Sequence, residues 1–101
     1  MTVTDETFDE EVLAQAGTVL VDFGAKWCPP CRALEPLLES LAEERKGSVK
    51  IVKVDTDESP EVTRRWSVRS VPTLVVFRDG QKHAQVVGAV PKEKLRALVE
   101  R

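Results

Sequence analysis

Two cysteines, Cys28 and Cys31, are the residues whose type and spacing could carry chemistry in this sequence. They are the only cysteines in the chain, and two prolines, Pro29 and Pro30, separate them. A pair with this spacing can exchange disulfides by thiolate attack, or it can supply two ligands to a zinc or iron–sulfur site. The spacing alone leaves both kinds of chemistry open.

A structural metal site needs about four ligands, and this chain offers few besides the two cysteines. Its single histidine, His83, lies far along the sequence in an expected hairpin. A four-ligand structural site could therefore form only between chains. We expect no metal site, so the residue inventory favours redox chemistry.

Length and composition indicate one small globular domain, residues 1–101. Of these residues 42% are hydrophobic and 32% are charged, a balance that suits a folded protein, and the formal net charge of −2 leaves no basic surface that would attract nucleic acid. No apolar run approaches the roughly 18 residues of a membrane span, and residues 1–6 lack the basic start of a secretory signal. We expect a cytoplasmic protein that binds neither nucleic acid nor membrane. Two cysteines are also too few for a fold that is held together by several structural disulfides.

Apolar spacing and the positions of glycine and proline predict alternating helices and strands. Thr4 or Asp5 should cap a first helix, which Gly17 ends, and Ser59 should cap a short helix that begins with Pro60. We expect the apolar positions of the first helix on one face: Phe8, Val12, Leu13 and Ala16. The other expected elements are strands 18–23, 49–55, 73–78 and 81–87, and helices from the cysteines to about 46, at 61–66, and from 91 to the end.

Strands separated by helices predict parallel neighbours that are joined by right-handed crossovers. Asp79-Gly80 is a two-residue hairpin signal, so strand 81–87 should return antiparallel to strand 73–78. The prediction is an α/β fold with a mixed central sheet, ending in an antiparallel hairpin, between two layers of helix. Cys28 then lies beyond the carboxyl end of a central strand and at the amino end of a helix, where such folds place their chemistry.

The amino end of that helix distinguishes the two cysteines. Free N–H groups and the positive end of the helix dipole lower the pKa of a thiol, and the thiolate is the attacking form. Cys28 holds this position, whereas Cys31 lies on the first helical turn with its backbone N–H toward Cys28. We predict that Cys28 is the exposed, attacking thiol and that Cys31 resolves the mixed disulfide.

Residues 21–31, which read Val-Asp-Phe-Gly-Ala-Lys-Trp-Cys-Pro-Pro-Cys, with Pro36 after them, resemble the active-site segment of the thioredoxin family. The resemblance extends to Val71-Pro72-Thr73, Asp79-Gly80 and Val87-Gly88-Ala89, so it covers essentially the whole chain. It implies the three-layer α/β/α thioredoxin fold and the reduction of disulfides in client proteins. It also implies a monomer that binds no cofactor and whose Cys28–Cys31 disulfide is reduced by a flavin-dependent, NADPH-linked thioredoxin reductase.

The resemblance implies roles for residues around the cysteine pair. Asp22 would be the buried carboxylate that helps to deprotonate Cys31, and Lys53 would lie beside it. The peptide bond before Pro72 would be cis. The groove that receives the client chain would be bordered by Trp27, Val71, Pro72, Gly88 and Ala89.

The residues support these roles to different degrees. An aspartate within an apolar strand loses hydration, so the pKa of Asp22 should rise toward neutrality unless the strand end turns it to water. Lys53 lies between two valines, where its stem could equally pack on the core with its ammonium in water. Trp27 is either a packing residue or a surface for a partner, and we expect Trp66 in the core.

Two positions beside the site depart from the family pattern. Most thioredoxins have Gly-Pro between the cysteines and a tryptophan where this chain has Gly24. The first helical turn tolerates Pro29 and Pro30, because an N–H there makes no helical hydrogen bond. Pro29 nevertheless removes a donor near the Cys28 sulfur and stiffens the loop. We expect these prolines, together with Lys53, to tune the balance between dithiol and disulfide.

Three functions are consistent with the sequence. The favoured one is a general disulfide reductase of the cytoplasm. The second is a protein disulfide oxidase or isomerase that works elsewhere, and both the absence of a signal segment and a buried Asp22 argue against it. The third is a non-catalytic binding subunit in which the cysteines are incidental; full activity of a Cys28→Ser variant would favour it.

Overall fold

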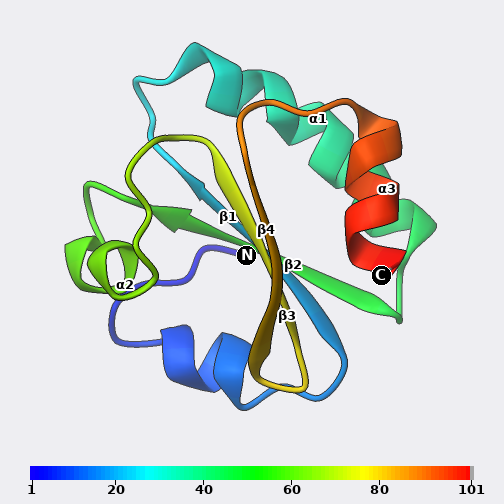
Figure 1. Cartoon of the computed structure of the whole chain (residues 1–101), viewed down its shortest axis with the longest axis horizontal. Coiled ribbons are helices and arrows are strands. Elements are labelled where there is room, and N and C mark those ends of the chain that lie inside the picture. Colours follow the sequence, from blue (N-terminus) through cyan, green and yellow to red (C-terminus); the bar gives the residue numbers. More distant parts are fainter. Residues whose placement is uncertain (101) are drawn as a thin grey trace.

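The computed structural model describes residues 1–100 and contains one four-stranded sheet with helices on both faces (Figure 1). The predicted strands are confirmed, and only the first is longer than expected, by one residue. The last residue of the expected final helix, Arg101, lies outside the described residues. The elements are η1 (Asp9–Leu13), β1 (Thr18–Gly24), α1 (Pro29–Glu44), β2 (Val49–Asp55), α2 (Pro60–Arg65), β3 (Thr73–Arg78), β4 (Gln81–Val87) and α3 (Lys92–Glu100).

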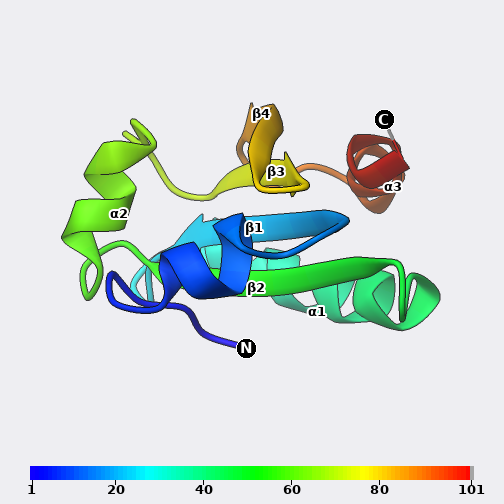
Figure 2. The ribbon, with the colours of Figure 1, turned by 90° about the horizontal axis from the view of Figure 1, so that it is seen from below.

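The strands lie in the order β2, β1, β3, β4, which Figure 2 shows from bottom to top. β1 is parallel to β2, and β3 and β4 form the predicted antiparallel hairpin. β3 is antiparallel to β1, so the prediction that every strand after a helix is parallel is wrong for β3. The six residues of α2 rise only about 9 Å, too little to return along a strand of about 23 Å, and β3 therefore starts near the edge where β2 ends.

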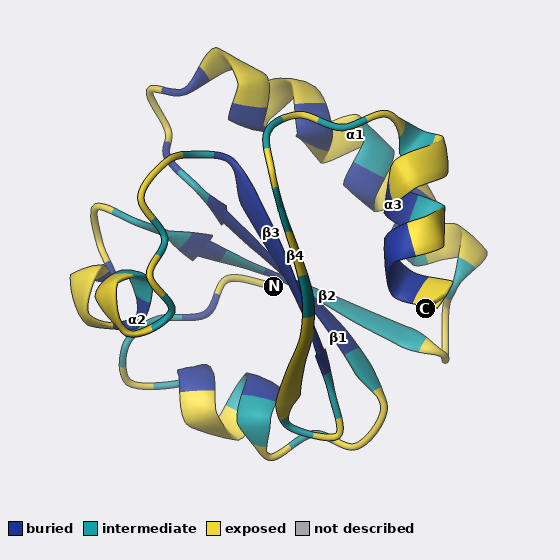
Figure 3. Ribbon diagram, viewed as in Figure 1, coloured by how far each residue is buried: buried dark blue, intermediate teal, exposed yellow. Residues whose placement is uncertain are grey.

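Two apolar cores lie on the two faces of the sheet, because neighbouring residues of a strand point to opposite sides. Figure 3 shows the buried positions on β1 and β3 and on the inner sides of the helices. The core beneath α1 and α3 includes Leu20, Leu34, Leu38, Leu41, Leu74, Val76, Leu95, Leu98 and Val99. The core on the side of η1 and α2 includes Phe8, Val12, Val19, Val21, Phe23, Val52, Val54, Val62, Val75 and Phe77.

Trp66 is half-buried and packs against the core beside α2, so the prediction of a core residue is confirmed in part. Its ring centroid is 4.9 Å from that of Phe77 and 6.0 Å from that of Phe8. Edge and tilted contacts of this kind add to the apolar area that the rings bury. The aromatic cluster fixes the short helix α2 against the sheet.

The alternation along the strands places Asp22 and Lys53 on the same face as α1. Asp22 is flanked in β1 by Val21 and Phe23, which point into the opposite core, and Lys53 is flanked in the same way by two valines of β2. Asp22 and Lys53 are direct neighbours in the parallel pairing of β1 and β2. The backbone positions of an acidic and a basic residue are therefore neighbours on the face of the sheet that α1 covers.

The first helix is shorter than the apolar spacing predicted. Only Asp9–Leu13 is helical as η1, and Ala16 is exposed rather than on the apolar face, whereas Phe8 and Val12 are buried as expected. The carbonyl oxygen of Glu11 accepts a hydrogen bond from Nζ of Lys50 at 2.9 Å. After η1 the chain turns tightly, with the N–H of Gln15 donating to the carbonyl of Val12 at 3.4 Å, and Gly17 with φ of +81° turns it toward β1.

Asp5 caps α2 and not the first helix. Its carboxylate oxygens accept hydrogen bonds from the backbone N–H groups of Glu61 at 3.3 Å and Val62 at 2.8 Å. Ser59 occupies the N-cap position of α2 as predicted, but its hydroxyl makes no capping bond and is buried without a partner. A residue more than 50 positions away in the sequence therefore supplies the cap that we expected from Ser59.

Two further features complete the fold. α3 begins at Lys92 rather than Pro91, and the carbonyl of Pro91 accepts hydrogen bonds from the first turn. The predicted burial of Leu95, Leu98 and Val99 on α3 is confirmed. In residues 1–100, no helix is both long and apolar enough to cross a membrane.

We predict that Asp5→Ala lowers the free energy of unfolding by about 1 kcal/mol, because two amide donors of α2 lose their acceptor. Ser59→Ala should leave stability unchanged or raise it, because it removes a buried hydroxyl that has no partner. Urea unfolding of both variants beside the parent measures the difference. A larger loss for Ser59→Ala than for Asp5→Ala would contradict the observed capping.

Candidate active site

The cysteine pair lies where β1 gives way to α1. β1 ends at Gly24 and α1 begins at Pro29, so Cys28 takes the N-cap position with extended backbone. Pro29 and Pro30 occupy the first two helical positions, where the helix needs no N–H donor. The predicted place of Cys28, beyond the carboxyl end of a central strand, is confirmed.

Cys28 and Cys31 form a disulfide with their Cα atoms 5.3 Å apart. The backbone N–H of Cys31 donates to Sγ of Cys28 at 3.2 Å, as the sequence predicted. Of the first three residues of α1, Cys31 alone has an N–H, because the two before it are prolines. One hydrogen bond and the helix dipole therefore act on the Cys28 sulfur, and both favour its thiolate form.

Both cysteines are buried, and Cys28 is more buried than we expected. Cys28 is 3% and Cys31 is 6% exposed, so the prediction that Cys28 is the exposed sulfur is wrong for the disulfide form. The pair packs with Ala25, and Val71 contacts this small cluster from the loop before β3. The field at the start of α1, rather than accessibility, distinguishes Cys28 from Cys31.

Trp27 stands on the surface beside the disulfide. Its side chain is 66% exposed, and its ring Nε1–H donates to a carboxylate oxygen of Asp57 at 2.8 Å. Trp27 and Val71 line a hollow of about 380 Å³. The hydrogen bond holds the exposed indole in place, which argues against simple core packing.

The loop before β3 and the loop after β4 meet next to this hollow. The Val71–Pro72 peptide bond is cis, as predicted, and Pro72 itself is buried. The backbone N–H of Gly88 donates to the carbonyl of Pro72 at 2.8 Å, and Gly88 has φ of +103°, which favours glycine. Ala89 follows it and is exposed. The structure thus joins Pro72 to Gly88 directly and leaves Ala89 at the surface.

Asp22 is a buried carboxylate in the middle of the central strand. It is 5% exposed, and its Oδ1 is buried without a hydrogen-bond partner. Burial raises the pKa of Asp22 from 3.8 to about 6, although the positive charge of Lys53 lowers this pKa and the negative charge of Glu35 raises it. The predicted rise of the pKa is confirmed, and the alternative of a water-exposed strand end is wrong.

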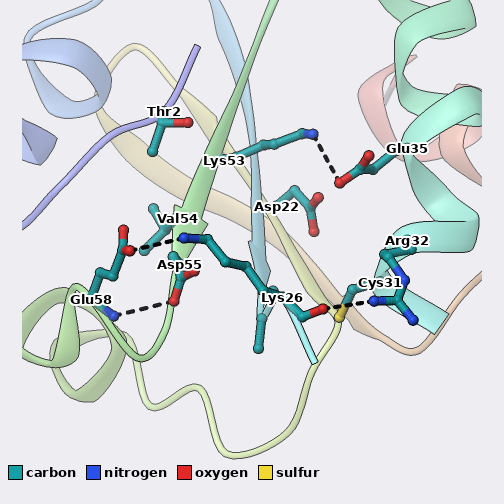
Figure 4. Close-up of a pocket in the computed structure, with 12 residues that line it drawn as sticks. Thr2, Asp22, Lys26, Cys31, Arg32, Glu35, Lys53, Val54, Asp55 and Glu58 are labelled. Atoms are coloured by element: carbon teal, nitrogen blue, oxygen red, sulfur yellow. Dashed lines mark hydrogen bonds and ion pairs between the residues drawn. The ribbon is translucent and has the colours of Figure 1, made fainter. Parts of the chain in front are cut away.

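A cavity of about 420 Å³ opens beside Asp22 and reaches Cys31 (Figure 4). Gly24 forms part of its wall, and a Cβ atom at that position would lie 3.4 Å from the Cβ and Sγ atoms of Cys31. The absence of a side chain at Gly24 therefore leaves space next to the Cys31 sulfur. Cys28 does not line this cavity, so the two sulfurs face different surroundings.

Lys53 and Glu35 form an ion pair at this cavity, with Nζ 3.3 Å from Oε1. The side chain of Lys53 is 43% exposed, so its stem lies along the sheet while its ammonium reaches water, as one of our alternatives held. Glu35 was missing from the residues that the sequence singled out. Its one signal was its place four residues after Cys31, on the same helical face.

Within residues 1–100, no group of three or more histidine, cysteine or acidic side chains could hold a metal ion. His83 lies on the exposed strand β4, where its ring contacts Arg78. The described cysteines are joined to each other and leave no free thiolate. The site is therefore a dithiol–disulfide pair with a buried carboxylate behind it.

Residues 1–101 match the family model described as Thioredoxin. The chain belongs to the thioredoxin family. It is 50% identical over 99 residues to Thioredoxin 1 of Nostoc sp., an alignment that covers 98% of this chain and 92% of that protein. It is 46% identical to Thioredoxin C-2 of Corynebacterium nephridii, in an alignment that covers 96% of this chain and 90% of that protein. It is 43% identical to the chloroplastic Thioredoxin M-type of Pisum sativum, in an alignment that covers 98% of this chain and 58% of that protein.

These relationships and the Cys28–Cys31 pair establish the chemistry of this thioredoxin-family protein. It is a thiol–disulfide oxidoreductase that acts as a protein-disulfide reductase. Its mixed sheet, with helices on both faces and a closing hairpin, is the thioredoxin fold. The redox-active group is the disulfide itself.

We predict that Asp22→Asn stabilises the oxidised protein at neutral pH. The pKa of Asp22 is about 6 in the folded protein and about 3.8 for an ordinary aspartate, which represents the unfolded chain. Burying the charge therefore lowers the free energy of unfolding as the pH rises from about 4 to about 6, and the full loss applies above that range. The variant, which carries no charge there, should be more stable than the parent by up to about 3 kcal/mol near pH 7.5 and by nothing extra near pH 3.5. Guanidinium unfolding at the two pH values is the measurement, and a pH-independent difference would contradict the buried charge.

Proposed function

We propose that the protein reduces client disulfides by a cycle in which Cys28 attacks and Cys31 resolves. The Cys28 thiolate attacks one client sulfur, which forms a mixed disulfide and releases the other client sulfur as a thiolate. Cys31 then attacks Sγ of Cys28, so the Cys28–Cys31 disulfide forms and the second client thiol leaves. The observation that carries this division is the N–H of Cys31 that donates to the Cys28 sulfur at the N-cap of α1.

Asp22 takes the proton of Cys31 in the second step. A neutral thiol is a poor nucleophile, and Cys31 is the third residue of α1 rather than its N-cap. Asp22 and Cys31 line the same cavity, and a carboxylate with a pKa of about 6 accepts protons near neutral pH. The proton passes from the Cys31 thiol to the Asp22 carboxylate, directly or through one water, as the sulfur attacks.

The client chain binds in a groove beside the disulfide. Its borders are the exposed indole of Trp27, the loop that carries Val71 and Pro72, and the loop that carries Gly88 and Ala89. The hollow next to Trp27 supports this placement because it offers an apolar surface adjacent to Cys28. The hydrogen bond between Gly88 and Pro72 holds the two loops together.

Electrons come from a flavin-dependent, NADPH-linked thioredoxin reductase, and the protein binds no cofactor of its own. The family relationship supports this partner and the disulfide-containing clients. A single thioredoxin domain, residues 1–101, acts as a monomer in the cytoplasm. The small net charge of −2 supports a protein that binds neither nucleic acid nor membrane.

The Cys-Pro-Pro-Cys sequence makes this an active-site variant in which Pro29 and Pro30 tune the reduction potential, together with Lys53. The prolines leave a single amide donor for the Cys28 sulfur and restrict the loop. Lys53 acts through the pKa of Asp22, which its charge lowers. Both effects of the prolines favour the disulfide over the dithiol. The missing N–H donors leave the thiolate less stabilised, and the restricted loop has less conformational freedom to lose when the disulfide closes.

We predict that Pro29→Gly makes the reduction potential less negative by about 20 mV, since an added N–H donor worth about 1 kcal/mol stabilises the reduced form. Loosening of the loop acts in the same direction. Equilibration of parent and variant with glutathione measures the shift. A shift of opposite sign would remove Pro29 from the tuning residues, and a parent potential near that of strong oxidants would favour a disulfide oxidase over a reductase.

We predict that Cys31→Ser accumulates mixed disulfides with clients, because Cys28 still attacks and no neighbouring thiol resolves the product. Cys28→Ser should trap none and should lose turnover with thioredoxin reductase and NADPH. Non-reducing gels of a model client, together with reductase-coupled insulin reduction, give both readouts. Equal trapping by the two variants would contradict the assigned roles, and full turnover by Cys28→Ser would favour a binding subunit.

A further inference from the structure

An ion pair crosses the cavity next to Asp22 and leaves that carboxylate alone. Nζ of Lys53 lies 3.3 Å from Oε1 of Glu35, and Figure 4 shows the lysine side chain extending past Asp22 to reach it. Lys53 is the direct strand neighbour of Asp22, and both side chains project from the same face of the sheet. The ammonium nevertheless pairs with Glu35, and Oδ1 of Asp22 accepts no hydrogen bond.

The sequence places Glu35 where it can draw the ammonium away. Glu35 lies four residues after Cys31 on α1, so it projects from the same helical face one turn further along. Its side chain is 50% exposed, and its charge therefore keeps much of its hydration. Asp22 is 5% exposed and has little hydration to offset its charge.

We propose that Glu35 is a positioning residue for Asp22: its carboxylate holds the Lys53 ammonium across the cavity and so keeps Asp22 unpaired beside Cys31. The inference deepens, and rests on, the proposed role of Asp22 as the acceptor of the Cys31 proton. An Asp22 that was paired with Lys53 would be a weaker base, because a neighbouring cation stabilises the carboxylate form.

The electrostatics of the site agree with this arrangement. Burial is the largest cause of the raised pKa of Asp22, the charge of Lys53 opposes it, and the charge of Glu35 supports it. An opposite charge that comes within about 4–6 Å lowers the pKa of a carboxyl by about 1–3 units. Loss of Glu35 therefore acts twice in one direction, since it removes a negative charge and releases the ammonium toward Asp22.

The other charged groups around the cavity have partners of their own. Lys26 pairs with Glu58 at 3.2 Å, and Arg32 donates to the backbone carbonyl of Lys26 at 3.0 Å. Asp55 accepts hydrogen bonds from two backbone N–H groups at the start of the next loop. On the remaining side, the strand neighbour of Asp22 in β3 is the apolar Leu74. Lys53 and Glu35 are thus the charged pair that controls Asp22.

The test is Glu35→Gln, with Glu58→Gln as the matched control. Both changes remove one negative charge from the wall of the same cavity, and both break an ion pair with a lysine. Carbon-13 NMR titration of the Asp22 carboxyl in the oxidised protein should show its midpoint about one pH unit lower, or more, in Glu35→Gln. Glu58→Gln should leave the midpoint within about 0.3 units of the parent.

A double variant separates the two ways in which Glu35 could act. In a Lys53→Gln background, Glu35→Gln should lose most of its effect on the Asp22 midpoint, because no ammonium is left to be repositioned. Glu35→Asp, which keeps the charge on a shorter side chain, should restore part of the parent value. A purely structural role of Glu35 would produce neither result.

A kinetic readout connects the positioning to the reaction. The pH profile of mixed-disulfide resolution, followed by stopped flow, should move to lower pH in Glu35→Gln by the same shift as the Asp22 midpoint. An Asp22 midpoint that stays unchanged or rises in Glu35→Gln overturns the inference. If the midpoint falls while neither Glu35→Gln nor Asp22→Asn alters resolution, the positioning stands and the proposed role of Asp22 as proton acceptor fails.

Discussion

The site depends on one costly feature, a carboxylate buried in the middle of the central strand without a hydrogen-bond partner. Asp22 interrupts an otherwise apolar strand, and with 5% of its surface exposed it loses most of the hydration that would stabilise its charge. Nothing in the packing of β1 requires an aspartate there, and an apolar residue would fit the strand better. The raised pKa is the direct consequence, and it makes the group useful as a proton acceptor at neutral pH.

The two cysteines differ because the fold places them in two environments. Cys28 is the N-cap of α1 and its sulfur lies at the N-terminus of the helix, whereas Cys31 borders the cavity that Asp22 also lines. In the proposed cycle the helix activates the Cys28 thiol and the Cys31 thiol depends on a local base, so the two steps of the exchange are controlled separately. Gly24 supports this division because its missing side chain leaves space beside the Cys31 sulfur.

Local patterns in the sequence predicted the strands, the hairpin and the cysteine pair, because each of these features depends on residues that are neighbours in the chain. Apolar runs located the strands, Asp79-Gly80 located the hairpin, and the helix that opens at the cysteines identified Cys28 and Cys31. The direction of β3 was beyond these patterns, because it depends on how far the short α2 can carry the chain. The cap from Asp5 to α2 and the pairing of Lys53 with Glu35 join distant segments, and their charged residues look like ordinary surface groups in the sequence. Burial of the cysteines likewise depends on Val71, which reaches them through the folded loop before β3.

The site rests on Asp22 being a buried, unpaired carboxyl whose proton equilibrium lies near neutral pH. The most direct measurement follows the side-chain carboxyl carbon of Asp22 by NMR in the oxidised parent protein from about pH 3 to pH 9. We expect a single titration with its midpoint near pH 6. A midpoint near the ordinary value of about 4 would contradict a buried, unpaired Asp22, because it would show a carboxylate that is hydrated or paired in solution.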